Sequence, residues 1–480
     1  MKARWWWWAL AASALACSEG GEDDLGARDL GVAQDGGADS GLLPDVGPDG
    51  GLPGDTGPSP DSGPLPDSGP NDETPLTERT PRNDFGCSVT RERTDHTPRY
   101  WGYGGHDLQV TTLGTAFLVR VESMPPNPFE AAPANFITSS VAGDGTFGPN
   151  VVLAPNDPAE ILWPTVASRG DGVAVVYVDG TRLRFVAFDG TGQVVVAAKD
   201  IPGITADFQT RPKLAPSGSG FGLVYHRPGT NSTEILFLAL DADGTPSGSP
   251  RTVTTTFDGY DPALVLVEVA DGFGLGFRDR INERFQVYFT KLSASGEVVV
   301  PRRRISLHEE ARVEAGISAG FDPNGLTLLA QGTGYLAAWT ESRAGESFDS
   351  GSSSVVKVVR LDGSGVPQGA AIPARAHEVD VDEVEPTLVP YRGAVALLWG
   401  RGSHIYACGG CTPDHRIDLL LLDPTDLTPV SNVATVAAPE SGIGGMLRRD
   451  VAVLGTQLLV VYDLTFHVHS TPGSATFGCD

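Results

Sequence analysis

Short apolar runs alternate with glycine-centred turns through the chain beyond residue 97. The segments "PTVASRGDGVAVVY" (164–177) and "PKLAPSGSGFGLVY" (212–225) each hold an apolar run, a Gly turn and a second run that ends in an aromatic residue. Runs of this length, rich in Val, Leu, Phe and Tyr and bounded by turn residues, are typical of β-strands. Helical periodicity is nearly absent, and only residues 308–320 fit a short turn of helix. The pattern predicts an all-β body.

The strand–turn–strand unit repeats along this body. Further copies occupy residues 262–277, 327–339, 386–399 and 451–462, with a weaker first copy at 108–121. A second hairpin follows most copies, and its turn glycines Gly192, Gly244 and Gly296 are spaced 52 residues apart. Two hairpins per unit form a four-stranded antiparallel sheet, so the repeats predict a β-propeller of seven four-stranded blades. Six or eight blades, or a pair of β-sandwiches, remain as alternatives.

Two cysteines lie at opposite ends of the body, at Cys87 and Cys479. The seventh unit lacks a complete fourth strand, while "FGCSVT" (85–90) is a free strand ahead of the first unit. A ring needs its last blade completed, so we expect this N-terminal strand to pair there and a Cys87–Cys479 disulfide to lock it. Closing so long a loop would contribute up to about 6 kcal/mol. The alternative is that Cys87 pairs elsewhere or stays free.

The first residues follow a different pattern. Lys2 and Arg4 precede an apolar run, residues 5–16, that is too short to span a bilayer. The run ends in Ala14-Leu15-Ala16-Cys17 and polar residues follow. This resembles the lipobox of bacterial lipoproteins, although Ala14 stands where the family usually has Leu. The resemblance implies that residues 1–16 are a cleaved signal peptide and that Cys17 is acylated. An ordinary secretory signal is the alternative.

Composition separates a linker from the body. Residues 17–84 are mostly Asp, Gly, Pro and Ser, which cannot bury enough apolar area to fold. We therefore expect a disordered acidic tether there and the propeller over residues 85–480. The formal charge is −26, and residues 18–96 hold 18 Asp and Glu against 5 Lys and Arg. Such an acidic chain argues against nucleic acid as a partner.

One segment carries four metal-binding side chains: His404, Cys408, Cys411 and His415. Exported thiols are usually oxidised, so a Cys408–Cys411 disulfide is preferred. A tetrahedral zinc site and a redox Cys-x-x-Cys are the alternatives. The nearby run "HEVDVDEVE" offers carboxylates for calcium at Asp380, Asp382 and Glu383, or is a solvated crossing. No other cofactor is expected.

The two faces of the predicted propeller differ in sequence. Antiparallel order places the tight Gly turns of both hairpins at one face. It places the longer segments between hairpins and between units at the other. Variable loops on one rim of a rigid scaffold are typical ligand-binding surfaces. Candidate contacts on that rim are Tyr260, Asp261, Arg278, Arg280, Arg401, His404 and His415.

The lipobox, linker and repeats together resemble the loosely defined class of bacterial β-propeller lipoproteins. The resemblance implies an outer-membrane protein on the periplasmic or cell-surface side, and Ser18 after Cys17 agrees with that sorting. We expect a monomeric, non-enzymatic module that binds a protein or glycan, because no recognised catalytic spacing accompanies the clustered acids. A hydrolase or lyase acting on polysaccharide is the alternative, and a scaffold for envelope proteins is a third hypothesis.

Overall fold

The computed structural model of the protein places its described residues in one compact unit, Ser68–Asp480. The structure describes residues 74–82 and 87–479, except 95–105, 111–115, 124–133, 142–145, 158–160, 171, 207–209, 219, 230–231, 258–261, 282–283, 307–311, 314–324, 343–353, 377, 379–380, 404–415, 438–445 and 467–468. Within these ranges the structure holds β-strands and one short 3-10 helix, η1 (Leu76–Glu78). The prediction of an all-β body is confirmed.

Four antiparallel sheets of four strands follow one another along the first two thirds of the chain. The first holds β2 (His106–Val110), β3 (Ala116–Ser123), β4 (Ala134–Val141) and β5 (Phe147–Asp157). The second holds β6 (Ile161–Arg169), β7 (Gly172–Asp179), β8 (Arg182–Phe188) and β9 (Val194–Asp200). The third holds β10 (Lys213–Ser217), β11 (Gly220–Pro228), β12 (Ser232–Leu240) and β13 (Arg251–Phe257). The fourth holds β14 (Val265–Val269), β15 (Gly272–Ile281), β16 (Arg284–Ser293) and β17 (Val298–Arg304).

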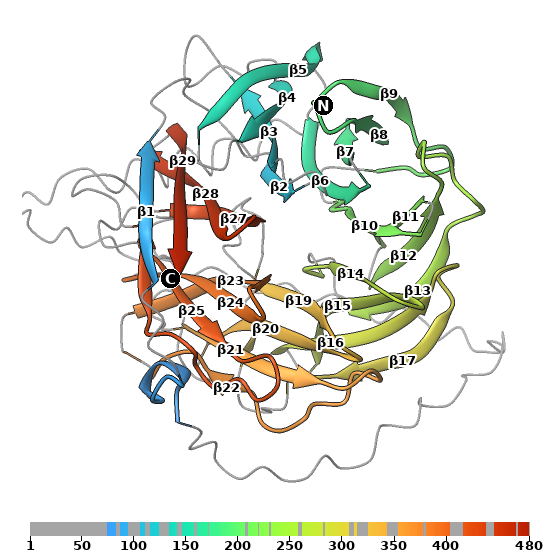
Figure 1. Cartoon of the computed structure of the whole chain (residues 1–480). Helices are drawn as coiled ribbons and strands as arrows, with labels where there is room; N and C mark the ends of the chain where they lie inside the picture. The colour runs from blue at the N-terminus through green and yellow to red at the C-terminus, as the bar shows by residue number, and fades with distance from the viewer. Residues whose placement is uncertain are drawn as a thin grey trace, which may run out of the picture. The chain divides into compact units, whose positions relative to one another are not determined.

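The remaining strands form a nine-stranded sheet and a closing sheet. The nine are β18 (Arg312–Val313), β19 (Leu326–Gln331), β20 (Gly334–Ser342), β21 (Ser354–Leu361), β22 (Ile372–Pro373), β23 (Val381–Tyr391), β24 (Ala394–Ser403), β25 (Arg416–Leu422) and β26 (Ala434–Ala437). The closing sheet holds β27 (Met446–Leu454), β28 (Gln457–Phe466), β29 (His469–Cys479) and β1 (Cys87–Thr94). Figure 1 shows the sheets arranged around a common centre, so the unit is a β-propeller.

Hydrogen bonding groups the described strands into six sheets, whereas the repeats predicted seven separate four-stranded ones. The difference arises in the nine-stranded sheet. There β19–β22 and β23–β26 are each antiparallel, and one parallel bridge between Ser354 and Asp382 joins them. Six was among the alternatives that the sequence left open.

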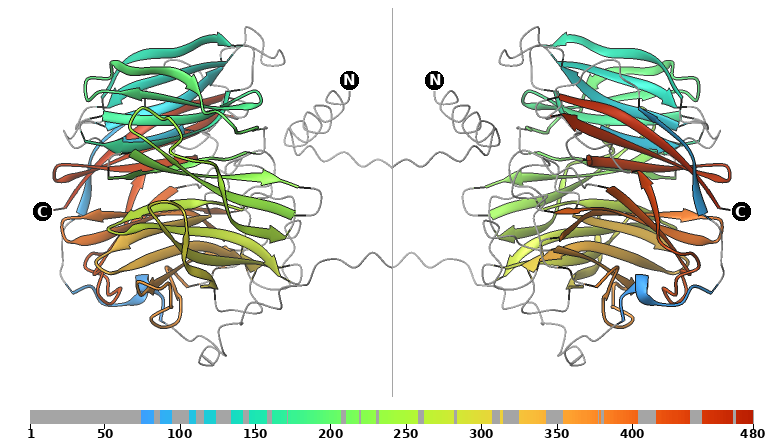
Figure 2. Two further views of the ribbon diagram at one scale, coloured as in Figure 1. Left: turned by 90° about the vertical axis from the view of Figure 1, so that its right-hand side faces the viewer. Right: turned by 90° about the vertical axis from the view of Figure 1, so that its left-hand side faces the viewer.

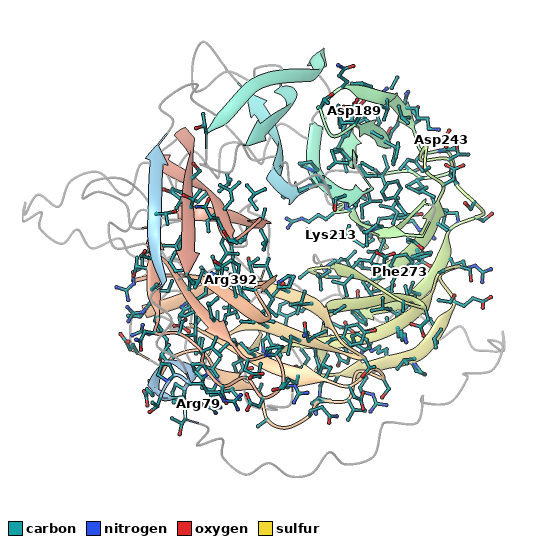
Figure 3. The ribbon with its side chains drawn as sticks, viewed as in Figure 1. Arg79, Asp189, Lys213, Asp243, Phe273 and Arg392 are labelled. Carbon is teal, nitrogen blue, oxygen red and sulfur yellow. The ribbon has the colours of Figure 1, made fainter. Side chains whose placement is uncertain are left out.

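The two ends of the propeller meet as predicted. Strand β1 pairs antiparallel with β29, and Cys87 lies directly opposite Cys479 in the register. The two strands lie side by side in both views of Figure 2. Arg392, labelled in Figure 3, donates a hydrogen bond to the carbonyl oxygen of Cys479 and so ties β29 to the preceding strand group. The side chain of Cys87 is outside the described residues, so the disulfide itself stays a proposal.

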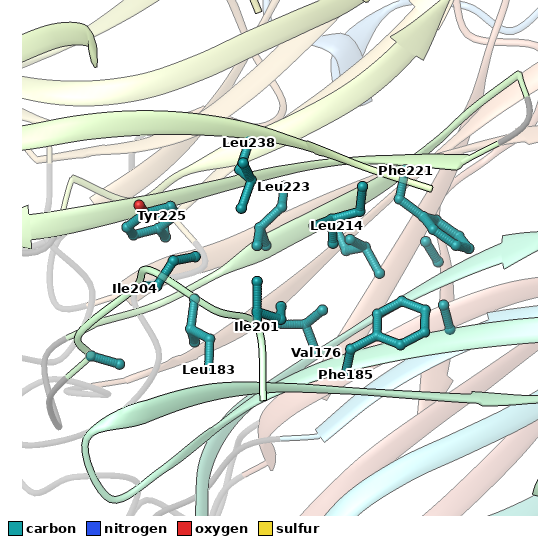
Figure 4. Close-up of a cluster of buried hydrophobic side chains, with 14 of the residues drawn as sticks. Val176, Leu183, Phe185, Ile201, Ile204, Leu214, Phe221, Leu223, Tyr225 and Leu238 are labelled. Carbon is teal, nitrogen blue, oxygen red and sulfur yellow. The ribbon is translucent and has the colours of Figure 1, made fainter. Parts of the chain in front are cut away.

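Neighbouring sheets bury apolar side chains against each other. Figure 4 shows the cluster between β6–β9 and β10–β13, in which Phe185 and Phe221 pack with ring centroids 5.8 Å apart. Each sheet has two apolar faces, and burying them against neighbours on both sides drives the circular arrangement.

A repeated contact between sheets accompanies the 52-residue spacing of the sequence repeat. The turn glycine of one sheet lies on the ring of a Phe in the preceding sheet, in the pairs Phe185–Gly244, Phe237–Gly296 and Phe289–Gly365. At Gly296, φ is +81° and any Cβ would overlap the ring of Phe237. Only glycine fits this position, because both the backbone conformation and the close approach exclude a side chain.

Part of the expected linker is ordered on the propeller. Leu76 in η1 is fully buried in the core between β19–β22 and β23–β26. The backbone N–H of Thr77 donates to the carbonyl of Ala374, and Arg82 forms an ion pair with Asp423. The segment "TPLTERTPR" (74–82), which the sequence assigned to the linker, thus contributes its one Leu to this interface. Residues 17–73 of the linker, with Cys17, lie outside the described residues.

Candidate functional site

The strand order defines two faces. We call the side of the turns within each hairpin, such as 189–193 between β8 and β9, the turn face. We call the opposite side, with the connection from the second to the third strand of each group, the loop face. Some loop-face connections are shorter than the sequence suggested, since β15 runs to Ile281 and β16 begins at Arg284.

Charged side chains recur where the second strand of each group reaches the loop face. The residue two positions after its terminal aromatic is charged in five groups: Asp179, Arg227, Asp279, Glu341 and Arg401. Each forms an ion pair, with Arg184, Glu234, Arg302, Lys357 and Glu378 respectively. The "aromatic-x-charged" string was visible in the repeats and could have located this ring of ion pairs.

The densest charged cluster lies at the loop-face end of β23–β26. Glu383 stands near the start of β23, Arg401 near the end of β24, and Arg416 and Asp418 at the start of β25. The connection from β22 to β23 contributes two more residues, Arg375 and Glu378. We call these six residues, three Arg and three carboxylates, the Arg375 cluster.

Arg375 faces all three carboxylates without reaching any of them. Its Nη2 is 3.6 Å from Glu378 Oε1, its Nη1 is 3.9 Å from Asp418 Oδ2, and its Nε is 4.0 Å from Glu383 Oε1. Its guanidinium makes no hydrogen bond to any residue that the structure describes, and Nε is buried. By contrast, Arg416 Nε lies 3.2 Å from Asp418 Oδ1, and Thr435 donates to the same oxygen.

Glu383 is one of two deeply buried acids of the cluster, with 3% of its surface exposed against 1% for Asp418. Its Oε2 accepts a hydrogen bond from the backbone N–H of Val356, 3.1 Å away. Its Oε1 is buried and has no hydrogen-bond partner among the described residues. Burial raises the pKa of the Glu383 carboxyl to about 7, against the lowering effects of the Val356 N–H, Arg375 and Arg401. A carboxyl with this pKa exists in both protonation states near neutral pH.

Three members of the cluster are partly exposed to solvent. Side-chain exposure is 45% at Glu378, 35% at Arg416 and 25% at Arg375. The other members are buried or nearly so. A ligand that reached Glu378 and Arg416 would therefore meet Arg375 next.

The structure brings two of the predicted site residues together, Arg401 and Glu383, both in the Arg375 cluster. Arg278 lies inside β15 rather than in a loop; it is buried, and its guanidinium stacks 4.3 Å from the ring centroid of Phe285. Arg280 also lies inside β15, and Asp382 lies in β23 opposite Gly402. Sequence reasoning missed Arg375, Arg416 and Asp418.

The other predicted site residues lie outside the described residues: Tyr260, Asp261, Asp380, His404, Cys408, Cys411 and His415. The zinc, calcium and Cys408–Cys411 hypotheses therefore stay predictions. Among the described residues, no three His, Cys, Asp or Glu side chains are grouped as metal ligands. No described helix has the length and apolar character that crossing a bilayer requires.

No known family matches the chain, and no curated protein is similar to it. Several solved structures are similar at low identity. Polysaccharide lyase Uly1 has a TM-score of 0.46 and 9% identity, over 82% of this chain and 95% of that one. An α-L-arabinofuranosidase from Fusarium graminearum has a TM-score of 0.41 and 11% identity, over 66% and 92%. The β-propeller domain of the Trilobed protease from Pyrococcus furiosus has a TM-score of 0.42 and 9% identity, over 76% and 94%.

Proposed function

We propose that the chain is an outer-membrane lipoprotein, anchored through acylated Cys17, whose propeller binds a protein or glycan at the loop face without transforming it. The supporting observation is the Arg375 cluster, where a partly exposed guanidinium and a buried carboxyl oxygen lack hydrogen-bond partners among the described residues. A buried polar atom without a hydrogen bond destabilises the protein. A ligand that supplies the missing hydrogen bond removes this penalty, which favours binding. Labelling with a fatty-acid analogue that Cys17→Ser abolishes tests the anchor.

We infer further that the propeller has seven blades. The two halves of the nine-stranded sheet, β19–β22 and β23–β26, bury an apolar core between them that includes Val356, Leu397 and Trp399. Strands of one flat sheet would lie edge to edge, whereas these two groups face each other. The parallel bridge at Ser354 and Asp382 is then a contact between neighbouring blades.

An array of neutral, acidic and cationic oligosaccharides and synthetic peptides tests the binding function with the full chain. Reaction of arginines with phenylglyoxal, with and without a bound array member, maps the contact. We expect protection of Arg227 and Arg416, which lie at the loop face, and unchanged reaction at Arg251, which lies at the turn face beside Glu297. Protection confined to Arg251, or no binding to any array member, contradicts the proposal.

A polysaccharide hydrolase or lyase is the second candidate, and Glu383 favours it. A general acid works best when its pKa is near the operating pH, and burial raises that of Glu383 to about 7. Asp418, buried in the same cluster, would be the second carboxylate. Chain shortening of any bound oligosaccharide, lost in Glu383→Gln, would favour the enzyme over the binding module.

A further inference from the structure

We propose that the Arg375 cluster binds a neutral, hydroxyl-rich ligand, such as a sugar with adjacent free hydroxyl groups. The inference rests on the proposed function, because it assumes that the loop face is the binding face, and it adds the chemical class of the ligand. The argument depends on the spacing of donors and acceptors around Arg375.

The gap between Arg375 and Glu383 has the width that one hydroxyl group bridges. Nε of Arg375 and Oε1 of Glu383 are 4.0 Å apart, and both are buried without hydrogen-bond partners among the described residues. An oxygen placed about 2.8 Å from each atom lies at hydrogen-bond distance from both. A hydroxyl there accepts from the Nε–H and donates to Oε1. One group would thus satisfy two unpaired atoms, and because both atoms are closed to solvent, a ligand hydroxyl reaches them only when the partly exposed Arg375 side chain shifts outward.

The same arrangement occurs twice more around the guanidinium. Arg375 Nη1 and Asp418 Oδ2 are 3.9 Å apart, and Nη2 and Glu378 Oε1 are 3.6 Å apart. Each gap pairs an N–H donor with a carboxylate acceptor, and neither closes to a direct hydrogen bond. Because the guanidinium is planar, the three gaps follow its edge. Neighbouring hydroxyl groups on a sugar ring present a comparable row of groups that each donate and accept.

Hydrogen-bonding capacity disfavours a charged group in these gaps. The cluster holds three guanidinium groups and three carboxyl groups, so it is close to neutral when Glu383 is ionised and attracts neither an anion nor a cation by net charge. The carboxylate of a uronate or a fully ionised phosphate accepts hydrogen bonds but donates none, so it leaves the carboxylate side of each gap without a donor. An ammonium group donates but cannot accept, so it leaves the arginine side of each gap without an acceptor. A hydroxyl suits both partners of every gap.

The experiment uses isothermal titration of the full chain with probes of three charges. The neutral probes are maltohexaose, mannohexaose, xylohexaose and laminarihexaose; the acidic probe is hexagalacturonate and the cationic probe is chitosan hexamer. We expect the chain to bind at least one neutral probe and neither charged one. Arg375→Lys keeps the charge but loses two of the three donor directions, so we expect it to weaken binding tenfold or more. Asp418→Asn serves the same purpose should Arg375→Lys fail to fold, as judged by thermal unfolding.

Arg251→Lys is the matched control, because Arg251 is an exposed, ion-paired arginine on the turn face. Binding should be unchanged in it. Preference for a charged probe would overturn the proposed ligand class. Binding of a neutral probe that neither Arg375→Lys nor Asp418→Asn weakens would overturn the proposed site. Binding at other loop-face residues would leave the proposed function standing. If neither the probes nor any array member bound to the chain, both the proposed function and the proposed ligand class would be wrong.

Discussion

Gly296 lies directly against the ring of Phe237 in the preceding sheet, with its φ at +81°. The contact links a turn glycine with a strand phenylalanine. The phenylalanines Phe185, Phe237 and Phe289 recur at a spacing of 52 residues, and each lies against the turn glycine of the next sheet. Packing between neighbouring sheets thus depends on the absence of a side chain at the turn glycine.

Gly296→Ala should lower the free energy of unfolding by about 2–4 kcal/mol, because its Cβ both strains the backbone and displaces the Phe237 ring. Gly332→Ala is the control: φ there is +59° but no atom lies within 4 Å of the added Cβ, so a loss of about 1 kcal/mol is expected. Urea unfolding measures both. Equal losses would show that the Phe237 contact contributes nothing.

Cys87 and Cys479 should form a disulfide, because they are directly paired across β1 and β29. Peptide mapping without reduction should recover the two cysteines in one cross-linked species. Cys479→Ser should lower stability by about 2–4 kcal/mol. Reductant should destabilise the natural chain by this amount more than the variant, because a Cys408–Cys411 bond would be lost equally in both. Alkylation of Cys479 in the unreduced protein would contradict the bond.

Lys357→Met should cost about 3–5 kcal/mol, because it leaves a buried carboxylate without its cation. Lys357 lies 2.8 Å from Glu341, whose side chain is 6% exposed and whose Oε2 also accepts from Trp339 Nε1. The corresponding change Arg251→Met breaks an exposed pair and should cost less than about 1 kcal/mol. Denaturant unfolding distinguishes them, and similar losses would refute the burial argument.

Glu383 should make the protein less stable as pH rises toward neutrality. Burial raises its pKa from 4.5 to about 7, so the folded state favours the protonated carboxyl. That contribution is fully present below pH 4.5 and is lost as pH rises through 7, amounting to about 3 kcal/mol. Glu383→Gln stays neutral, so the stability difference between variant and natural chain should shift by this amount in favour of the variant between pH 4.5 and 8. A constant difference would contradict the raised pKa.

The fold was predictable because its determinants are local and repeated. Each unit shows its strand, glycine turn and terminal aromatic in the sequence, and "FGCSVT" ahead of the first unit matched the strand missing from the last. The sheet count was less predictable. It depends on one bridge between Ser354 and Asp382, which no pattern within a repeat encodes.

The candidate site was predictable only in position. The loop face was inferred from strand order, but Arg375 lies in a short crossing with Glu378, and Glu383 follows in β23, whereas Asp418 comes from β25. A contact such as that between Arg375 and Asp418, which are far apart in the sequence, leaves no periodic signal. Arg278 was misplaced for the opposite reason, since its polar sequence resembles a loop while the hairpin of β15 and β16 extends through it.

Hydrogen–deuterium exchange of the full chain, with and without a bound oligosaccharide from the array, tests the loop-face assignment most directly. We predict slower exchange in peptides that contain Arg375–Glu383 and Arg416–Asp418, and no change in the turn-face peptides of residues 189–193 and 293–297. Protection of the turn-face peptides, with the Arg375 cluster unaffected, would contradict the account.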